Sequence, residues 1–408
     1  MLASFPLFFI FFLYFFIKRF VSYPSLGVFN LYITSFLLFL STVFFYDDMG
    51  IYPMAVVYLF VVCFFISEFF FYNAFALILP TRHFQSVNLL NHSKIILFIT
   101  SFVLLILYIS IRSDFVFGQY RYIMVRDGYL EKDLLNSLSY SLAYAISFIL
   151  GYYHQSARLT YRLLFLLFLT FLSLLYGSKL IVVISTIYFT AGIFASSLAN
   201  KEKKINFNRR SFLAYISLLS VILIAGFYVR SFFMDLSSIG EFFDYILQSA
   251  PSYGLLSFPA FSSFITDYLS GETIDNFSLG EITFNGLFTL FGQESSPQIS
   301  PPLFKEFVSS SGIETVIFTF YRTLVSEFGI FITFLLFAFF GFLSALFSYS
   351  ITFFRGRISL FLACYSVLFV FIIYGVFMST LLSRTHFVTL FIIWVYFIEF
   401  SSVRKLNN

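Results

Sequence analysis

Residues 316–350 read VIFTFYRTLVSEFGIFITFLLFAFFGFLSALFSYS, and this stretch decides the fold class. From Gly329 to Ser350 it contains no charged residue. About 20 mostly apolar residues are enough for a helix to cross a bilayer, so the stretch predicts a membrane span. Arg322 and Glu327 stand just before the uncharged run. We expect this first part either to lie across the outer interface or to re-enter the membrane.

The same apolar character extends along the whole chain. Of its 408 residues 60% are hydrophobic and 11% are charged, and Phe alone occurs 67 times. A soluble protein of this length needs a more polar surface, so many apolar side chains must face lipid. The net charge of +4 gives no indication of nucleic-acid binding. Cys63 and Cys364 lie inside apolar runs, which argues against a structural disulfide.

Apolar runs of sufficient length predict an all-α polytopic membrane protein with about eleven helices. The first run is expected to be a retained helix, because it lacks the features of a cleavable signal peptide. We divide the chain into helices one to eight (1–230), a cap loop (231–312) and helices nine to eleven (313–408). The expected helices are 2–17, 26–46, 53–79, 95–111, 134–153, 162–176, 180–199, 212–229, 316–350, 359–378 and 385–400.

Basic loops predict the orientation, because Lys and Arg gather on the cytoplasmic side. The strongest signal is the loop 200–210, with five Lys or Arg residues. Alternation from this loop places the segment around Asp47–Asp48 and the long loop 231–312 outside. We therefore expect a bacterial inner-membrane protein whose long loop is periplasmic. That loop is acidic and contains amphipathic stretches at 241–247 and 258–268, so it should be a partly helical cap.

Among the basic residues predicted on the outer side, four at helix ends stand against the usual placement of positive charge. Each stands at or near a different helix end, and together they are Lys179, Arg230, Arg322 and Arg384. Each alone is explained as a side chain that snorkels to the interface or pairs with a loop carboxylate. Together they favour an anion site, because Lys and Arg bind phosphate groups.

Glu327 and His386 are the candidate acid and base on the outer side. A carboxylate in an apolar helix is a functional candidate, although a helix ion pair with Arg322 explains Glu327 equally well. His386 follows Arg384 by two positions and is the single histidine predicted outside, but lone interfacial histidines are more often structural. The acidic pair Asp47–Asp48 is also external, and such pairs are common by chance.

Motifs of soluble enzymes are absent from the sequence. It contains no phosphate-binding Gly-Lys-Ser/Thr loop, no zinc-ligand spacing and no nucleophile elbow. We therefore expect no cofactor and no metal.

Three short motifs resemble those of the O-antigen polymerases, the Wzy-type enzymes that join lipid-linked oligosaccharide repeat units. Gly177-Ser178-Lys179 opens a helix where the family commonly has Gly-Ser-Arg. Leu279 to Phe284 resembles a loop motif of Gly-Glu-x-Thr-Phe type, after an aromatic stretch at 253–261. Thr319 to Arg322, followed by Ser326 to Gly329, is similar to an aromatic segment with an acidic-Phe-Gly step. Lys179 and Glu327 depart from the more usual Arg and Asp.

The resemblance implies the fold of that family, a membrane glycosyltransferase (GT-C-like) architecture, and also its reaction. A sugar hydroxyl of a lipid-linked acceptor would attack the anomeric carbon of an undecaprenyl-diphosphate-linked donor. Lys179, Arg230, Arg322 and Arg384 would hold the leaving diphosphate. Glu281, Glu327 or His386 would act as base or orient the acceptor, and Tyr253 and Tyr321 would stack on sugars. A chain-length regulator protein is a partner that the family suggests.

Three alternatives remain open at this point. A flippase of lipid-linked sugars explains the hydrophobicity but not the long acidic loop or the lack of repeats. The related O-antigen ligase shares the architecture, but we expect a histidine in its long loop, which here has none. A membrane acyltransferase would need an early external histidine that this chain does not offer.

Overall fold

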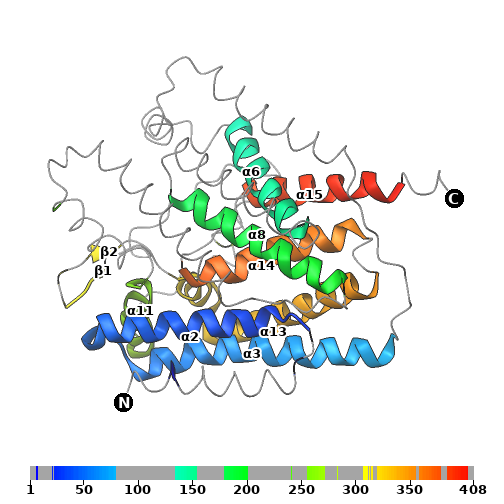
Figure 1. The fold of residues 1–408 in the computed structure, drawn as a ribbon. Coiled ribbons are helices and arrows are strands. Elements are labelled where there is room, and N and C mark those ends of the chain that lie inside the picture. The colour runs from blue at the N-terminus through cyan, green and yellow to red at the C-terminus, as the bar shows by residue number, and fades with distance from the viewer. Residues whose placement is uncertain are drawn as a thin grey trace. The chain divides into compact units, whose positions relative to one another are not determined.

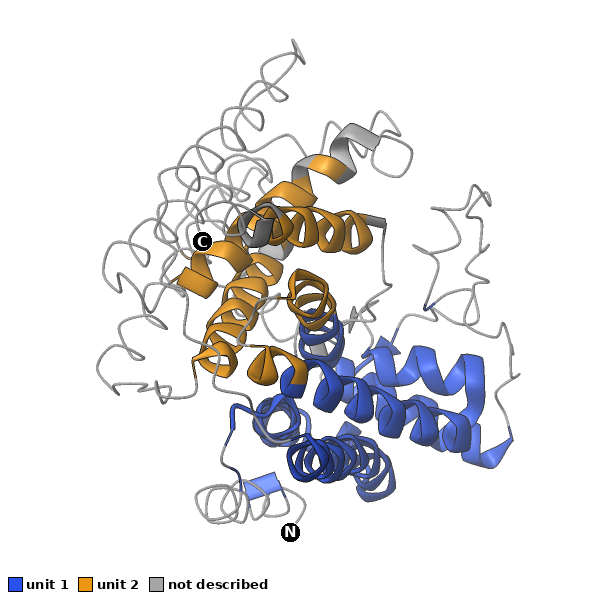
Figure 2. Ribbon diagram, turned by 90° about the vertical axis from the view of Figure 1, so that its right-hand side faces the viewer, with its two compact units in different colours: residues 1–81, 245–349, 368–384 blue, residues 82–244, 350–367, 385–408 orange. Residues whose placement is uncertain are grey.

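A computed structural model describes the chain over parts of its length. The described residues are 6–7, 21, 23–79, 134–153, 179–200, 240, 255–271, 283, 307–310, 312, 314–315, 319–354, 358–377 and 384–402, and at some helix ends and in one strand only the backbone is described. The chain forms two compact units, coloured separately in Figure 2. Unit 1 comprises residues 1–81, 245–349 and 368–384, and unit 2 comprises residues 82–244, 350–367 and 385–408.

Seven of the expected helices are present (Figure 1). They are α2 (Leu26–Phe44), α3 (Ile51–Ile78), α6 (Leu134–Tyr153), α8 (Lys179–Ala199), α13 (Phe320–Phe353), α14 (Ser359–Phe377) and α15 (Arg384–Ser402). Among the described residues five of these, α2, α3, α8, α13 and α14, are long and apolar enough to cross a membrane. The helices expected at 2–17, 95–111, 162–176 and 212–229 lie almost wholly outside the described residues. The prediction of a helical multi-pass membrane protein is confirmed, and the number eleven stays a prediction.

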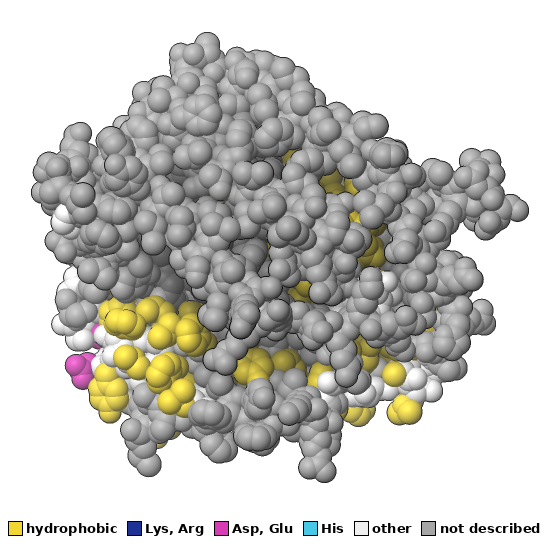
Figure 3. Space-filling model, in the orientation of Figure 1, with side chains coloured by type: hydrophobic (Ala, Val, Ile, Leu, Met, Phe, Trp, Pro, Cys, Tyr) yellow, Lys and Arg dark blue, Asp and Glu magenta, His cyan; other side chains and the backbone are white. Residues whose placement is uncertain are grey.

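The surface agrees with this assignment. Large hydrophobic side chains of α3 and α13 are exposed, among them Phe70 (64%) and Phe331 (71%). In Figure 3 the visible side chains of described residues are mostly hydrophobic. Such a surface is costly in water and is expected where helices face hydrocarbon.

In unit 1, α3 and the later part of α13 run side by side in the same direction. Ser67 Oγ donates to the carbonyl of Ala338 at 2.6 Å, and the ring of Phe71 meets that of Phe342 edge-on at 4.9 Å. Gly341 permits this approach, because a Cβ there would lie 2.4 Å from the carbonyl oxygen of Phe64. Small residues allow such close packing between membrane helices.

The start of α2 is fixed to α3 by a buried carboxylate. Glu68 accepts hydrogen bonds from Ser25 Oγ at 2.5 Å and from the backbone N–H groups of Leu26 (3.1 Å) and Gly27 (2.7 Å). Ser344 Oγ of α13 donates to the same carboxylate at 2.8 Å. The first N–H groups of a helix have no partner within it, and in a membrane they must find one. Glu68 therefore joins three helices at the N-terminus of α2.

The opposite end of α2 carries described parts of the long loop, and we call it the loop end of unit 1. Here η1 (Tyr46–Asp48) connects α2 to α3. Helix α11 (Ser257–Ser270) packs against both helices, beside their shared end in Figure 1, and it ends at Gly271, whose φ is 76°. The strands β1 (Phe307–Val308) and β2 (Glu314–Thr315) form a short antiparallel hairpin. The helix predicted at 258–268 is thus confirmed, whereas the stretch at 241–247 is not described.

Helix α13 is broken at Gly329, whose φ of 73° and ψ of 168° are not helical. The rings of Tyr321 and Phe337 stack at 5.6 Å between centroids. Sixteen residues of unbroken helix would separate these two positions by about 24 Å, so the chain must bend back at Gly329. The first part therefore does not continue the later part of α13, and its place at the interface or within the membrane stays a prediction. We call residues 320–328 the short helix.

In unit 2, α6 and α8 cross at two glycines. A Cβ on Gly151 would lie 2.0 Å from the carbonyl oxygen of Phe189, and one on Gly192 would lie 2.2 Å from that of Phe148. The backbones are therefore in direct contact, as at other small-residue crossings between membrane helices.

Candidate functional site

Arg322 lies in the first turn of the short helix and is 8% exposed. Its guanidinium carbon lies 5.1 Å from the centre of the Phe264 ring, which belongs to α11 of the long loop. A guanidinium over an aromatic face gains a cation–π attraction that grows when water is excluded. The amphipathic pattern of α11 explains this position, because its apolar face, including Phe261 and Ile265, is buried. A buried cation at the loop end is thus held by the loop itself.

Glu327 lies near the other end of the short helix and is fully buried. The backbone N–H of Thr283 donates to Glu327 Oε2 at 3.1 Å, and the Thr283 hydroxyl donates to the same oxygen. Thr283 belongs to the loop motif 279–284, and Glu327 belongs to the acidic-Phe-Gly step. Two motifs that the sequence analysis singled out separately are therefore in direct contact.

Tyr321 lies in the interior of unit 1. We expected it to stack on a sugar, which stays a prediction, and in this structure its ring has no exposed surface. It stacks on Phe60 and Phe337 with centroids 6.2 and 5.6 Å away, and its hydroxyl lies 3.5 Å from Thr34 Oγ1. In this structure Tyr321 is a packing residue that fastens the short helix to α2, α3 and the later part of α13.

His386 belongs to unit 2, where it is 5% exposed. Its Nδ1 is hydrogen-bonded to the Tyr188 hydroxyl at 2.9 Å. Tyr144 stacks on Tyr188 at 5.3 Å and on the imidazole at 6.0 Å. This aromatic enclosure supports the structural interpretation of His386 over its interpretation as a base.

The remaining site residues are placed only in part. Lys179 is the first residue of α8 and Arg384 is the first residue of α15, but their side chains are not described. Arg230, Tyr253 and Glu281 lie outside the described residues. The convergence of the four cations therefore stays a prediction, and Arg322 is the one of the four whose side chain is described.

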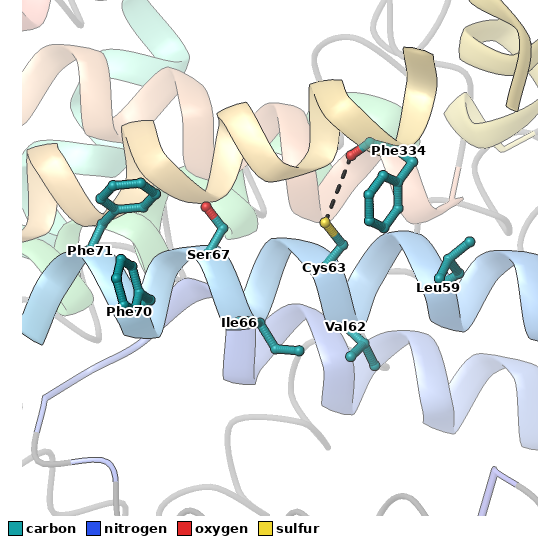
Figure 4. Close-up of a pocket in the computed structure, with 8 residues that line it drawn as sticks. All are labelled: Leu59, Val62, Cys63, Ile66, Ser67, Phe70, Phe71 and Phe334. Carbon is teal, nitrogen blue, oxygen red and sulfur yellow. Dashed lines mark hydrogen bonds between the residues drawn. The ribbon is translucent and has the colours of Figure 1, made fainter. Parts of the chain in front are cut away.

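A groove between α3 and α13 is a different kind of surface (Figure 4). Its volume is about 410 Å³, and its lining includes Leu59, Ile66, Phe70 and Phe334, with Cys63 Sγ 3.8 Å from the Phe334 carbonyl. This lining contains no charged side chain, so it suits contact with hydrocarbon rather than chemistry on a charged substrate. Among the described residues no cluster of His, Cys, Asp or Glu is arranged to hold a metal ion.

Glu68 is the buried charged residue that the sequence analysis missed. The signal was available, because a lone carboxylate within the apolar run 53–79 is costly unless it has partners. Its partners, Ser25 and Ser344, are distant in sequence, so no local pattern could reveal them.

The site assembled by the described residues is therefore the short helix with its two loop contacts, Phe264 on Arg322 and Thr283 on Glu327. Comparison with models of protein families, with curated proteins and with solved structures finds no match to this chain.

Proposed function

We propose that the protein is a membrane glycosyltransferase that joins lipid-diphosphate-linked oligosaccharide repeat units, as the O-antigen polymerases do. One observation carries the proposal. The short helix presents a cation and a carboxylate, both buried, to two separate segments of the long loop. A transferase that reads a glycan with its loop and binds a diphosphate at the membrane surface needs this connection between loop and charge.

The proposed reaction needs neither nucleotide nor metal. The acceptor hydroxyl oxygen forms a bond to the donor anomeric carbon, and the bond from that carbon to the diphosphate oxygen breaks. The hydroxyl proton passes to a carboxylate base, and the electron pair leaves with undecaprenyl diphosphate. Arg322 stabilises the charge that develops on the diphosphate. Because Glu327 already accepts two hydrogen bonds from Thr283, we assign it to orientation of the loop and leave Glu281 as the base.

Reconstitution tests the proposal directly. The purified protein is placed in liposomes with a synthetic undecaprenyl-diphosphate-linked repeat unit that carries a fluorescent label. We expect a ladder of longer glycans on a gel and release of undecaprenyl diphosphate.

A flippase is the alternative that this experiment separates, because it would move the labelled unit between leaflets without lengthening it. A ligase is separated by adding a lipid A-core acceptor, to which it would transfer glycan without building a ladder. Absence of a ladder from an intact, reconstituted protein would contradict the polymerase proposal.

A further inference from the structure

The turn between α2 and α3 holds part of the long loop through one carboxylate. Asp48 Oδ1 and Oδ2 lie 2.9 and 3.1 Å from the Ser310 backbone N–H, and Oδ2 accepts from the Ser310 hydroxyl at 3.0 Å. Hydrogen bonds to an ionised acceptor are stronger than those between neutral groups. Asp47, the exposed neighbour, makes none of these contacts. The two residues of the external acidic pair therefore differ: Asp48 is hydrogen-bonded to the long loop through Ser310, and Asp47 is not.

The same turn also holds α11. The backbone N–H of Gly50 donates to Ser262 Oγ at 2.9 Å, and Ser41 Oγ donates to the Leu255 carbonyl at 2.9 Å. Because α11 carries Phe264, these bonds fix the ring that lies over Arg322. The α2–α3 turn, together with Ser41 in the last turn of α2, therefore anchors two loop segments.

The hairpin held by Asp48 leads directly into the short helix. Thr315 pairs with Phe307 in the hairpin, and Thr319 stands immediately before Phe320. Four residues span at most about 14 Å even when extended. The short connection therefore limits how far the hairpin can move from the start of the helix that carries Arg322.

We propose that Asp48 is a positioning residue for the candidate site: through Ser310 it fixes the hairpin and thereby the short helix. The role in turnover rests on the proposed function, whereas the mechanical role does not. Loss of the Asp48 carboxylate frees the hairpin, loosens the short helix and misplaces Arg322 relative to the diphosphate.

Cysteine labelling tests the mechanical role without any assay of activity. In full-length protein with Cys63→Ser and Cys364→Ser, a single probe is introduced as Thr323→Cys, beside Arg322, where the native side chain is 8% exposed. We expect Asp48→Ala to raise the rate of maleimide labelling about tenfold, in line with loss of charge-assisted hydrogen bonds. Asp48→Asn, which keeps one acceptor oxygen, should give a labelling rate between those of the wild type and Asp48→Ala. Asp47→Ala should leave the labelling rate unchanged.

A second probe separates local positioning from general loosening. Ala345→Cys lies in the same helix α13 and is fully buried. Its labelling should stay slow in Asp48→Ala. Acceleration at both probes, or at neither, would overturn the proposal.

Turnover in the liposome assay then addresses the functional half. We expect Asp48→Ala to lower the rate of ladder growth about tenfold while the KM for the lipid-linked unit changes less, because the site is misplaced rather than removed. If Asp48→Ala labels faster at Thr323→Cys but builds the ladder at the wild-type rate, the positioning role is refuted. A wild-type protein that builds no ladder, yet shows the expected labelling pattern, would refute the polymerase proposal alone.

Discussion

Unit 1 contains two fully buried carboxylates among its described residues, and they differ in what they hold. Glu68 accepts from Ser25, Ser344 and the backbone at the start of α2, so its partners lie at or within membrane helices. Glu327 accepts from Thr283, a residue of the long loop. The first carboxylate joins helix to helix, and the second joins a helix to the loop.

The difference shows why burial of charge alone does not identify a site. Both residues satisfy the rule that an ionisable group in a membrane must have partners. What separates them is their surroundings: the Glu68 partners belong to the starts and interiors of helices, whereas Glu327 shares the short helix with Arg322 and meets the long loop. We therefore propose that Glu68 serves stability and that Glu327 serves the proposed reaction.

The largest expected effect is on stability, from Glu68→Ala. The change leaves four buried donors without an acceptor and should lower the free energy of unfolding by about 3–5 kcal/mol. The apparent melting temperature of the purified protein in detergent, followed by size-exclusion chromatography, measures this. A variant as stable as the wild type would show that the junction at α2 does not depend on the carboxylate.

Glu327→Gln should lower activity more than it lowers stability, the reverse of the change at Glu68. The amide keeps the size of the side chain but loses the charge that holds Thr283, so the loop is misplaced and ladder growth should fall about 10- to 100-fold. The melting temperature should fall less than in Glu68→Gln, which serves as the matched control. Equal losses of stability in the two glutamine variants, with polymerisation retained in Glu327→Gln, would remove the distinction between the carboxylates.

Removal of a hydroxyl that donates to either carboxylate should have a smaller effect and separates the two carboxylates further. Ser344→Ala removes one hydrogen bond to Glu68 and should cost about 1 kcal/mol of stability without changing ladder growth. Thr283→Ala removes one bond to Glu327 and should slow ladder growth about fivefold. Thr283→Ser keeps the hydroxyl and should restore most of the rate. If Thr283→Ala and Thr283→Ser behave alike, the hydroxyl contact has no part in function.

The helices were predictable from sequence because a span needs a long apolar run, and such runs end where polar residues begin. The boundaries of α3 and α14 fall within a few residues of those expected. The amphipathic pattern likewise located α11. The packing of Tyr321 was not predictable, because an aromatic residue beside an arginine fits sugar stacking and core packing equally well, and its contacts with Phe60 and Thr34 come from distant segments.

The contacts of the candidate site could not be predicted from local sequence patterns. Glu327 and Thr283 are 44 residues apart, and Asp48 and Ser310 are 262 apart. Charge in an apolar run indicated Glu327 as a candidate, but only the bend at Gly329 and the fold of the loop determine what the carboxylate meets.

The central claim is that Arg322 is held under the loop to stabilise a leaving diphosphate. The most direct measurement is ladder growth by Arg322→Ala in liposomes that contain the same amount of folded protein as the wild type. We predict a loss of at least about 100-fold, as for removal of one group that stabilises developing charge, with Arg322→Lys partly active because it keeps the charge but not the planar fork. A normal glycan ladder from Arg322→Ala would contradict the account.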